Sequence, residues 1–228
     1  MKLSRLLCGV FALAGSAMSA AAAELVVNGS FEAGNVGFTS DYTYVSGPAA
    51  SARGTPTYAI ATAPASAANA YPDWGTYGDH TSGTGKMLIA DASAANAWSE
   101  NVVVHAGTTY TYSFWARQAD GASNSNPVLH FSVNGTGLGD LAVSSGSSDG
   151  WQQKTGTYTA MTSGAVTLAV ADTNSSVPYN DFALDDISFT GATTGTVPEP
   201  ASWALMLAGF GVVGGVMRRR ATAASVTA

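Results

Sequence analysis

The sequence is poor in cysteine and in basic residues. Its single cysteine, Cys8, lies close to the N-terminus. A disulfide within the chain is therefore excluded, and stability must come from a buried core, with or without a metal ion. Nine lysine and arginine residues face 15 acidic ones, which gives a net charge of −6.

The shortage of basic residues is greater in the middle of the chain. Residues 24–197 hold 14 of the acidic residues, all but Glu199, and only four basic ones, so their net charge is 4 − 14 = −10. Such a segment lacks the basic surface that phosphate backbones require, and nucleic acid is excluded as a partner. Its acidic side chains leave the binding of a cation open.

The N-terminus has the plan of a secretory signal peptide, which we assign to residues 1–23. Two basic residues begin it, residues 6–18 are mostly apolar, and the last residues are small. The apolar stretch is shorter than the roughly 20 residues of a membrane-spanning helix. We expect cleavage before Glu24, which also removes Cys8. A buried N-terminal helix is the alternative.

The C-terminus holds a second apolar segment. Residues 201–217 carry no charge and are followed by three consecutive arginines. We expect one transmembrane helix over 201–217, which is long enough for a thin or adjusted bilayer. The arginines would then stay on the cytoplasmic side. The preceding domain would be exported, in agreement with the signal peptide.

A short motif lies at the start of this apolar segment, and a basic cluster follows the segment. This order is recognisable. The motif residues are Pro198, Glu199, Pro200 and Trp203, and the basic residues are Arg218, Arg219 and Arg220. Together they resemble the PEP-CTERM sorting signal in its PEPxxWA form, over residues 198–220. The resemblance implies recognition by an exosortase, cleavage near the motif, and transient anchoring in the inner membrane. A permanent single-span anchor is the alternative.

The same resemblance implies a location. Such proteins are released or attached at the surface of Gram-negative bacteria that produce exopolysaccharide. We therefore expect the mature chain in the periplasm, at the outer membrane surface or in the extracellular matrix.

Between these ends the dominant pattern is the alternation of apolar and polar residues. It occurs in residues 109–117, 129–134 and 166–171, and Gly, Asn, Asp and Ser clusters separate such runs. No long amphipathic helical pattern interrupts them. We predict an all-β fold, an antiparallel β-sandwich over residues 24–190. A linker, 191–197, leads to the sorting signal, and a short tail, 221–228, ends the chain.

Three segments of this domain resemble galactose-binding-like β-sandwiches, in particular carbohydrate-binding modules of families 4 and 9. They are residues 25–32, 110–117 and 182–189. The resemblance implies a jelly-roll topology and binding of exopolysaccharide or another glycan. It also implies a structural calcium ion that joins the first and last strands.

The residues suited to calcium are Glu32, Asp185 and Asp186, because the ion prefers several oxygen ligands. Strand parity places Asp185 on the buried side of Ile187 and Phe189, where a carboxylate needs a partner or a metal. Alternatively, Asp186 shares a face with Leu184. A capping or turn glutamate and two solvated aspartates are the third interpretation.

The best candidate for ligand binding is a segment rich in aromatic residues that we expect to form a loop. Its candidate residues are Tyr71, Trp74, Tyr77 and Asp79. The rings could stack on sugars while the carboxylate accepts hydroxyl hydrogen bonds. Alternatively, they cover a sheet edge or fill the core.

The usual catalytic patterns are absent. A G-x-S-x-G match at 146–150 lies in a polar turn after all three histidines, and those histidines lack the spacing of a zinc site. We therefore expect a binding module without catalytic activity. A structural matrix protein is one alternative. A polysaccharide hydrolase is another, with a carboxylate pair drawn from Asp73, Asp79, Asp91, Glu100 and Asp181.

Overall fold

The alternating runs of the sequence form the strands of two sheets that face each other. The computed structural model describes residues 22–46, 56–67, 73–120, 126–144, 150–174, 180–192 and 205–213. The strands are β1 (Ala22–Glu24), β2 (Thr43–Tyr44), β3 (Thr57–Ala61), β4 (Met87–Asp91), β5 (Asn96–Val104), β6 (Thr109–Gln118), β7 (Val128–Val133), β8 (Thr136–Ala142), β9 (Gln152–Thr159), β10 (Gly164–Asp172) and β11 (Phe182–Ala192). A four-residue helix, α1 (Pro64–Ala67), follows β3.

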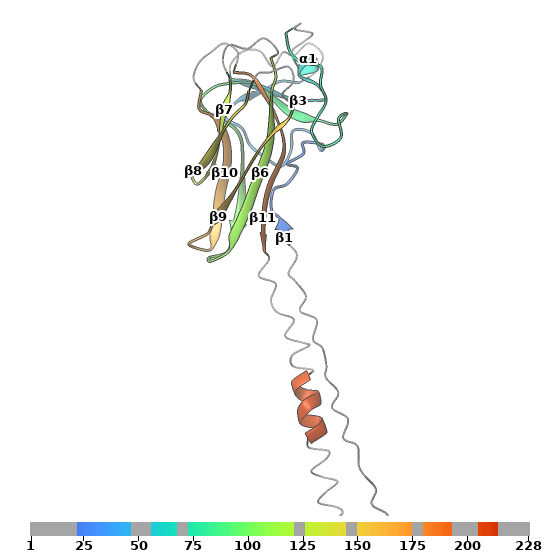
Figure 1. Cartoon of the computed structure of the whole chain (residues 1–228), viewed down its shortest axis with the longest axis vertical. Helices are drawn as coiled ribbons and strands as arrows, with labels where there is room; N and C mark the ends of the chain where they lie inside the picture. Colours follow the sequence, from blue (N-terminus) through green and yellow to red (C-terminus); the bar gives the residue numbers. More distant parts are fainter. Residues whose placement is uncertain are drawn as a thin grey trace, which may run out of the picture. The chain divides into compact units, whose positions relative to one another are not determined.

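Sheet A has the order β2-β3-β4-β11-β6-β9, with β1 also paired to β11, and sheet B has the order β5-β10-β7-β8. The short β2–β3 pair is parallel, and the other described pairs are antiparallel. In Figure 1, β7, β8 and β10 lie in one layer and β6, β9 and β11 in the other. This arrangement confirms the predicted all-β sandwich. The strand β11 continues to Ala192, two residues into the predicted linker.

The main core lies between the sheets, where the alternation predicts it. In β6, Tyr112 and Phe114 are buried while Thr111 is exposed. The ring of Tyr112 stacks on Phe131 of β7 at 4.2 Å between centroids. Burial of each such large apolar side chain contributes about 1.5–3 kcal/mol. The apolar residues of the period-two pattern therefore define the strands and, because they are buried, also stabilise them.

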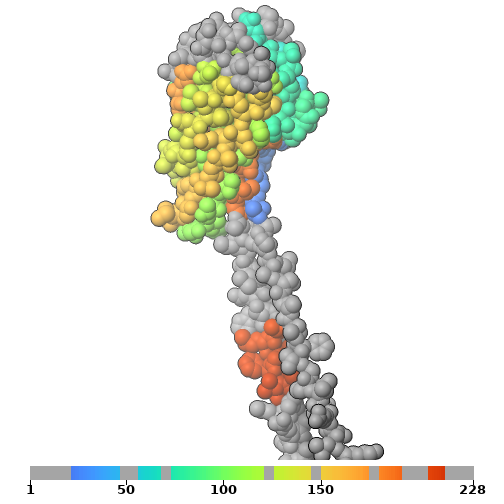
Figure 2. All heavy atoms as spheres, viewed as in Figure 1, coloured from blue at the N-terminus to red at the C-terminus, as the bar shows by residue number. Residues whose placement is uncertain are grey.

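A second apolar cluster covers the outer face of sheet A, and we call it the outer cluster. Its buried members are Ala59, Ala67, Trp74, Met87, Ile89, Ala119 and Ala183. Because β4 contributes Met87 and Ile89 to this cluster and Leu88 to the main core, it is apolar on both faces. In Figure 2, turquoise residues that follow β3 lie against the upper part of the sandwich.

The first and last described segments of the sandwich are joined through β11. The backbone N–H of Leu25 donates to the Phe189 carbonyl at 3.1 Å, and that of Ile187 donates to the Gly29 carbonyl at 3.0 Å. A Cβ atom at Gly29 would lie 1.9 Å from the Ile187 carbonyl oxygen, so only glycine permits this approach. The segment from Leu25 to Gly29 therefore docks onto the final strand.

The strand β11 contains a bulge that corrects the predicted orientation of its aspartates. The register with β6 shifts between Asp185 and Ser188, and Asp186 has a φ of 47°. The extra residue puts Ile187 on the core side with Leu184, while Asp185 stays on the opposite, outer side. The expectation that Asp185 shares the side of Ile187 is therefore wrong. The alternative that pairs Asp186 with Leu184 is wrong as well, because Asp186 also turns toward the outer face.

Residues 205–213 form a helix with exposed side chains. The predicted span of 201–217 extends beyond these residues at both ends, outside the described part of the chain. Within the described part, none of the helices has the length and apolar character needed to cross a membrane.

Candidate functional site

The aromatic segment proposed for ligand binding lies against the outer face of sheet A. Trp74 is only 3% exposed and belongs to the outer cluster. The hydroxyl of Tyr77 donates to the Gln118 carbonyl at 2.7 Å, and the Arg117 guanidinium lies 3.9 Å from its ring centre. Asp79 is also 3% exposed. Tyr71 lies outside the described residues.

In this conformation Trp74 and Asp79 have no free surface for a sugar. Asp79 instead closes a turn: it accepts the backbone N–H groups of Ser82 at 2.7 Å and Gly85 at 2.6 Å. The Asp79 carboxylate and the Ser82 hydroxyl together accept four hydrogen bonds within this turn. A direct ligand role for this segment stays a prediction, and it would require the segment to leave the sheet.

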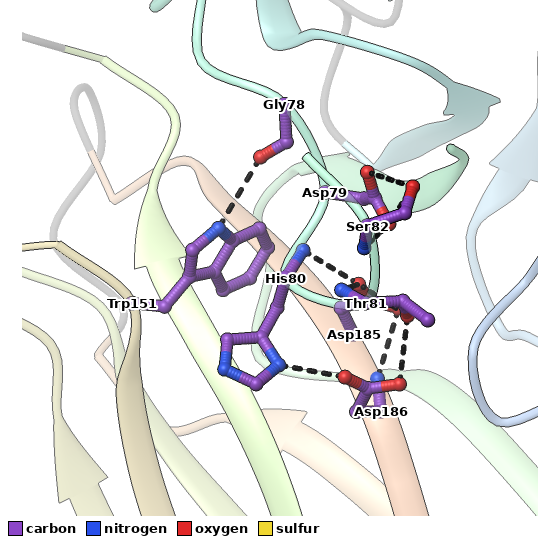
Figure 3. Close-up of polar contacts among 8 residues, drawn as sticks. All are labelled: Gly78, Asp79, His80, Thr81, Ser82, Trp151, Asp185 and Asp186. Atoms are coloured by element: carbon purple, nitrogen blue, oxygen red, sulfur yellow. Dashed lines mark hydrogen bonds and ion pairs between the residues drawn. The ribbon is translucent and has the colours of Figure 1, made fainter. Parts of the chain in front are cut away.

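The turn is attached to the bulge of β11 through hydrogen bonds to two aspartates. Asp185 is fully buried and accepts the backbone N–H groups of His80 at 2.8 Å and Thr81 at 3.2 Å. The Nδ1 atom of His80 lies 2.6 Å from an Asp186 oxygen, and its ring stacks on Trp115 at 3.8 Å. Figure 3 shows His80 and Thr81 pointing toward the two aspartates. The bulge therefore supplies the anchor for the segment that covers sheet A.

The residues proposed for calcium occupy two places along this turn. Glu32 accepts the backbone N–H of Lys86 at 3.1 Å, whereas Asp185 and Asp186 hold His80 and Thr81. Across the described ranges, no group of three or more Asp, Glu, His or Cys residues is arranged to hold a metal ion. The three carboxylates alone therefore do not form a calcium cage.

A second buried carboxylate, Asp181, lies where sheet A meets the outer cluster. The pairing of Phe182 with Ala90 places Asp181 directly opposite Asp91 on the next strand. Burial, followed by the charge of Asp91, raises the pKa of Asp181 from 3.8 to about 7. Burial and the like charge opposite both disfavour the ionised form, so Asp181 stays protonated to a higher pH than a free carboxyl group.

A groove of about 330 Å³ lies along the edge of β5, in sheet B. We call it the β5 groove, and its lining residues are Gly37, Phe38, Thr39, Ser99, Glu100 and Asn101. The backbones of Thr39 and Ser99 exchange two N–H···O hydrogen bonds of 2.8 Å, which fix its two walls. Its size is at the lower end of the range of about 300–1,000 Å³ for small-molecule sites.

Phe38, Thr39 and Ser99 are among the residues that line the β5 groove. Phe38 packs edge-on against the fully buried Phe31, with 5.4 Å between ring centres and an interplanar angle of 89°. The hydroxyl oxygens of Thr39 and Ser99 lie 2.8 Å apart and form one hydrogen bond. These groups are held by the core and by the backbone, so the groove is formed without a ligand.

Glu100 and Asn101 also line the groove, and strand alternation turns their side chains to opposite faces of β5. The two oxygens of Glu100 share the backbone N–H of Val27 at 3.0 and 3.2 Å. Burial raises the pKa of Glu100, and the charge of Glu24 raises it further, against the effect of the Val27 hydrogen bond. The Asn101 side-chain oxygen accepts the Thr167 hydroxyl at 2.7 Å. Its NH2 group has no partner within the described ranges.

Sequence reasoning did not identify the β5 groove, although Glu100 carried a signal. In β5, Trp98, Glu100 and Val102 lie on the same face by strand alternation, and Trp98 and Val102 are buried in the main core. A carboxylate at such a position is costly unless it reaches the rim or a partner. The partner segment at residues 37–39 could not be found from the sequence, because its pairing with Ser99 joins positions 60 residues apart.

Comparison with known families identifies the C-terminal segment. Residues 196–221 match the family described as the PEP-CTERM protein-sorting motif. This part of the chain is therefore a sorting motif of the kind that marks exported proteins of Gram-negative bacteria. No curated protein matches the chain.

Solved structures with a similar fold include binding domains and enzymes. The CBM22-1 xylan-binding domain from Paenibacillus barcinonensis Xyn10C is 14% identical over 79% of this chain and 100% of its own, with a TM-score of 0.48. An apo-form cyclase from Fischerella sp. is 14% identical over 76% of this chain and 98% of its own, with a TM-score of 0.50. A sugar-binding EclA C-terminal domain is 20% identical over 43% and 69%, with a TM-score of 0.38. At such identities, the likeness concerns the fold alone.

The pKa of Asp181 predicts how stability depends on pH. Because the folded-state pKa is raised from 3.8 to about 7, the stabilising contribution is complete below pH 3.8 and is lost as pH rises through 7. We expect this group to lower the free energy of unfolding by about 2–4 kcal/mol between pH 4 and 8. The measurement is made with a chelator present, so that metal binding does not contribute. Urea unfolding at several pH values measures it.

Asp181→Asn should reduce that slope, since the side chain no longer ionises, whereas the exposed Asp73→Asn should leave it unchanged. Identical pH slopes for the wild type and Asp181→Asn would contradict the assignment.

Proposed function

We propose that this chain is an exported, exosortase-processed protein whose β-sandwich binds carbohydrate at the β5 groove. In this proposal, residues 1–23 are a signal peptide and residues 201–217 anchor the chain transiently in the inner membrane. The sorting motif at 196–221 supports the export and processing steps. The mature domain then works at the cell surface or in the exopolysaccharide matrix.

The observation that carries the binding proposal is the combination of groups in the β5 groove. Sugars present apolar C–H faces and many hydroxyls, so their sites pair a ring with hydrogen-bonding side chains. The lining of the β5 groove includes the aromatic residue Phe38, the acidic residue Glu100 and Asn101, whose NH2 group has no partner within the described ranges. The hydroxyls of Thr39 and Ser99 can both donate and accept.

The same lining favours binding over hydrolysis. Glycoside hydrolysis needs two carboxyl groups on either side of the scissile bond, about 5–10 Å apart. Glu100 is the one carboxylate among the residues that line the β5 groove. The described lining residues supply no second carboxylate to complete such a pair. We therefore propose a module without catalytic activity.

The binding proposal predicts a specific loss of affinity. Asn101→Ala removes a hydrogen-bond donor to the sugar while leaving the walls of the groove in place. Loss of one such bond, worth about 1 kcal/mol, should weaken binding to exopolysaccharide roughly five-fold. Affinity electrophoresis of the exported protein in gels containing the polysaccharide measures this.

The control is Thr157→Ala, an exposed substitution on β9 of the other sheet, which should not change mobility. Equal retardation of the wild type and both variants would place binding elsewhere. Absence of retardation in every polysaccharide tested would favour a structural matrix protein.

We also propose a structural calcium ion near the bulge of β11. The support is the resemblance of the chain ends to carbohydrate-binding modules and the fully buried carboxylate of Asp185, whose described partners are N–H and O–H groups and no basic side chain. The jelly-roll topology belongs to the same proposal. Glu32 and Asp186 would have to move toward Asp185, or backbone carbonyls would have to complete the ligand set.

Calcium removal tests this proposal. If the ion joins the first and last strands, a chelator should lower the melting temperature, because binding to the folded state alone stabilises it. Glu32→Ala and Asp185→Ala should each abolish the response to added calcium. A melting temperature that is the same with calcium and with chelator would reject the site.

The sorting proposal predicts a processed C-terminus. Mass spectrometry of the protein recovered from the cell surface or medium should give a mass without Arg218, Arg219 and Arg220, and a C-terminus close to Pro198. Recovery of the intact C-terminus in the membrane fraction would instead indicate a permanent anchor. Glu199→Ala should reduce processing if the motif is recognised.

A further inference from the structure

The chain contains two Asn-Gly pairs with almost the same neighbours. One is Asn28-Gly29, in the sequence Val-Asn-Gly-Ser, and the other is Asn134-Gly135, in the sequence Val-Asn-Gly-Thr. Because glycine has no Cβ atom, its backbone nitrogen reaches the side chain of the preceding asparagine easily, and that asparagine is prone to lose its amide. Since the local sequences match, a difference in reactivity between the two pairs must come from the fold.

The fold protects Asn28. Its NH2 group donates to the carbonyls of Gly34 at 2.9 Å and Val36 at 2.8 Å, and its Oδ1 atom accepts the N–H of Ala33 at 2.9 Å. The next residue, Gly29, is packed so closely that a Cβ atom there would lie 1.9 Å from a backbone oxygen of β11. The amide of Asn28 can therefore leave only after both donated hydrogen bonds break and the segment moves away from β11.

Asn134 lies in the two-residue turn between β7 and β8 and lacks this protection. Both turn residues have left-handed φ angles, 50° for Asn134 and 74° for Gly135, as an Asn-Gly hairpin turn requires. Within the described ranges, the NH2 group of Asn134 and the backbone N–H of Gly135 have no hydrogen-bond partner. Nothing lies within 4 Å of the position that a Cβ atom would take at Gly135, so this glycine has room to move.

The hydrogen bonds that Asn134 does make favour the reaction. Its backbone N–H donates to the carbonyl of Thr167 at 2.8 Å, and its Oδ1 atom accepts the N–H of Thr167 at 2.9 Å. The second bond polarises the side-chain carbonyl and would stabilise the negative oxygen that forms when a nucleophile adds to Cγ. Because β8 is an edge strand of sheet B, the side of the turn that follows Asn134 opens at low cost.

We propose that Asn134 is a site of spontaneous deamidation in the folded protein, and that Asn28 is not. Hydroxide from solvent removes the proton from the backbone nitrogen of Gly135, which then attacks Cγ of Asn134. The new N–C bond closes a succinimide ring, the bond from Cγ to Nδ2 breaks, and the departing nitrogen takes a proton from water and leaves as ammonia. Water opens the ring at one carbonyl to give aspartate and at the other to give isoaspartate. Either product adds a negative charge, and isoaspartate also inserts an extra atom into the backbone of the turn.

Incubation of the exported protein at pH 8 and 37 °C tests this proposal, followed by ammonia release and by peptide mapping with mass spectrometry. We expect conversion at Asn134 to be at least roughly ten-fold faster than at Asn28, because each donated hydrogen bond that must break slows the reaction roughly five-fold. The same incubation in guanidinium chloride, at a concentration that unfolds the chain, is the control. There the two pairs should react at the same rate.

Two variants assign the fast phase of ammonia release. Asn134→Asp keeps an acceptor oxygen for Thr167 and has no amide to lose, so it should remove the fast phase. The matched control is Asn28→Asp, the same change in the other pair, which should retain the fast phase. Far-UV circular dichroism and thermal melting verify that both variants are folded, and peptide mapping of the wild type gives the site without either variant.

Equal rates at the two pairs in the folded protein, or faster conversion at Asn28, would overturn the proposal. An Asn134 that reacts in the unfolded chain but stays intact in the folded protein would also overturn it, because the turn would then be protective. Rates that stay unequal in guanidinium chloride would assign the difference to the sequence, and the structural explanation would fail.

Discussion

The strand β11 is the constraint on which the rest of the sandwich depends. It pairs with β1, β4 and β6, so it joins the N-terminal segment to the centre of sheet A. Its hydrogen bonds with Gly29 and Leu25 hold the segment that continues to Phe38 and Thr39. That segment then forms one wall of the β5 groove. A site in sheet B is therefore positioned by a strand of sheet A.

The bulge in β11 gives the two faces of that strand different tasks. Before and after the bulge, apolar side chains such as Leu184 and Ile187 enter the main core. The bulge itself turns Asp185 and Asp186 outward, where they hold His80 and Thr81. The outer face of sheet A is therefore covered by a turn that is hydrogen-bonded to the bulge. The edge of sheet B, by contrast, has an open groove.

Much of the sandwich could be predicted from the sequence because burial of one sheet face imposes a period of two. The assignments for residues 109–117, 129–134 and 166–171 are confirmed for this reason. The same rule failed at Asp185, because one extra residue reverses the side of every residue after it and leaves no mark on composition.

The candidate site was harder to predict because it depends on packing between distant segments. Aromatic residues in a polar segment suit a sugar site and a cover for a sheet equally well, and the structure buries Trp74 as a cover. Glu100 differs from its neighbours in β5, but it becomes part of a groove only because the fold places residues 37–39 beside it. Sorting residues such as Pro198 were recognisable because their order along the chain is itself the signal.

The most direct test of this account is to map the ligand by NMR on the isotope-labelled exported protein. Oligosaccharide fragments of the exopolysaccharide are titrated in, and the amide chemical shifts are followed residue by residue. The account predicts that the largest changes occur at Thr39, Ser99, Glu100 and Asn101, with little change at residues 73–82. Changes centred on residues 73–82, with Glu100 and its neighbours unaffected, would contradict it.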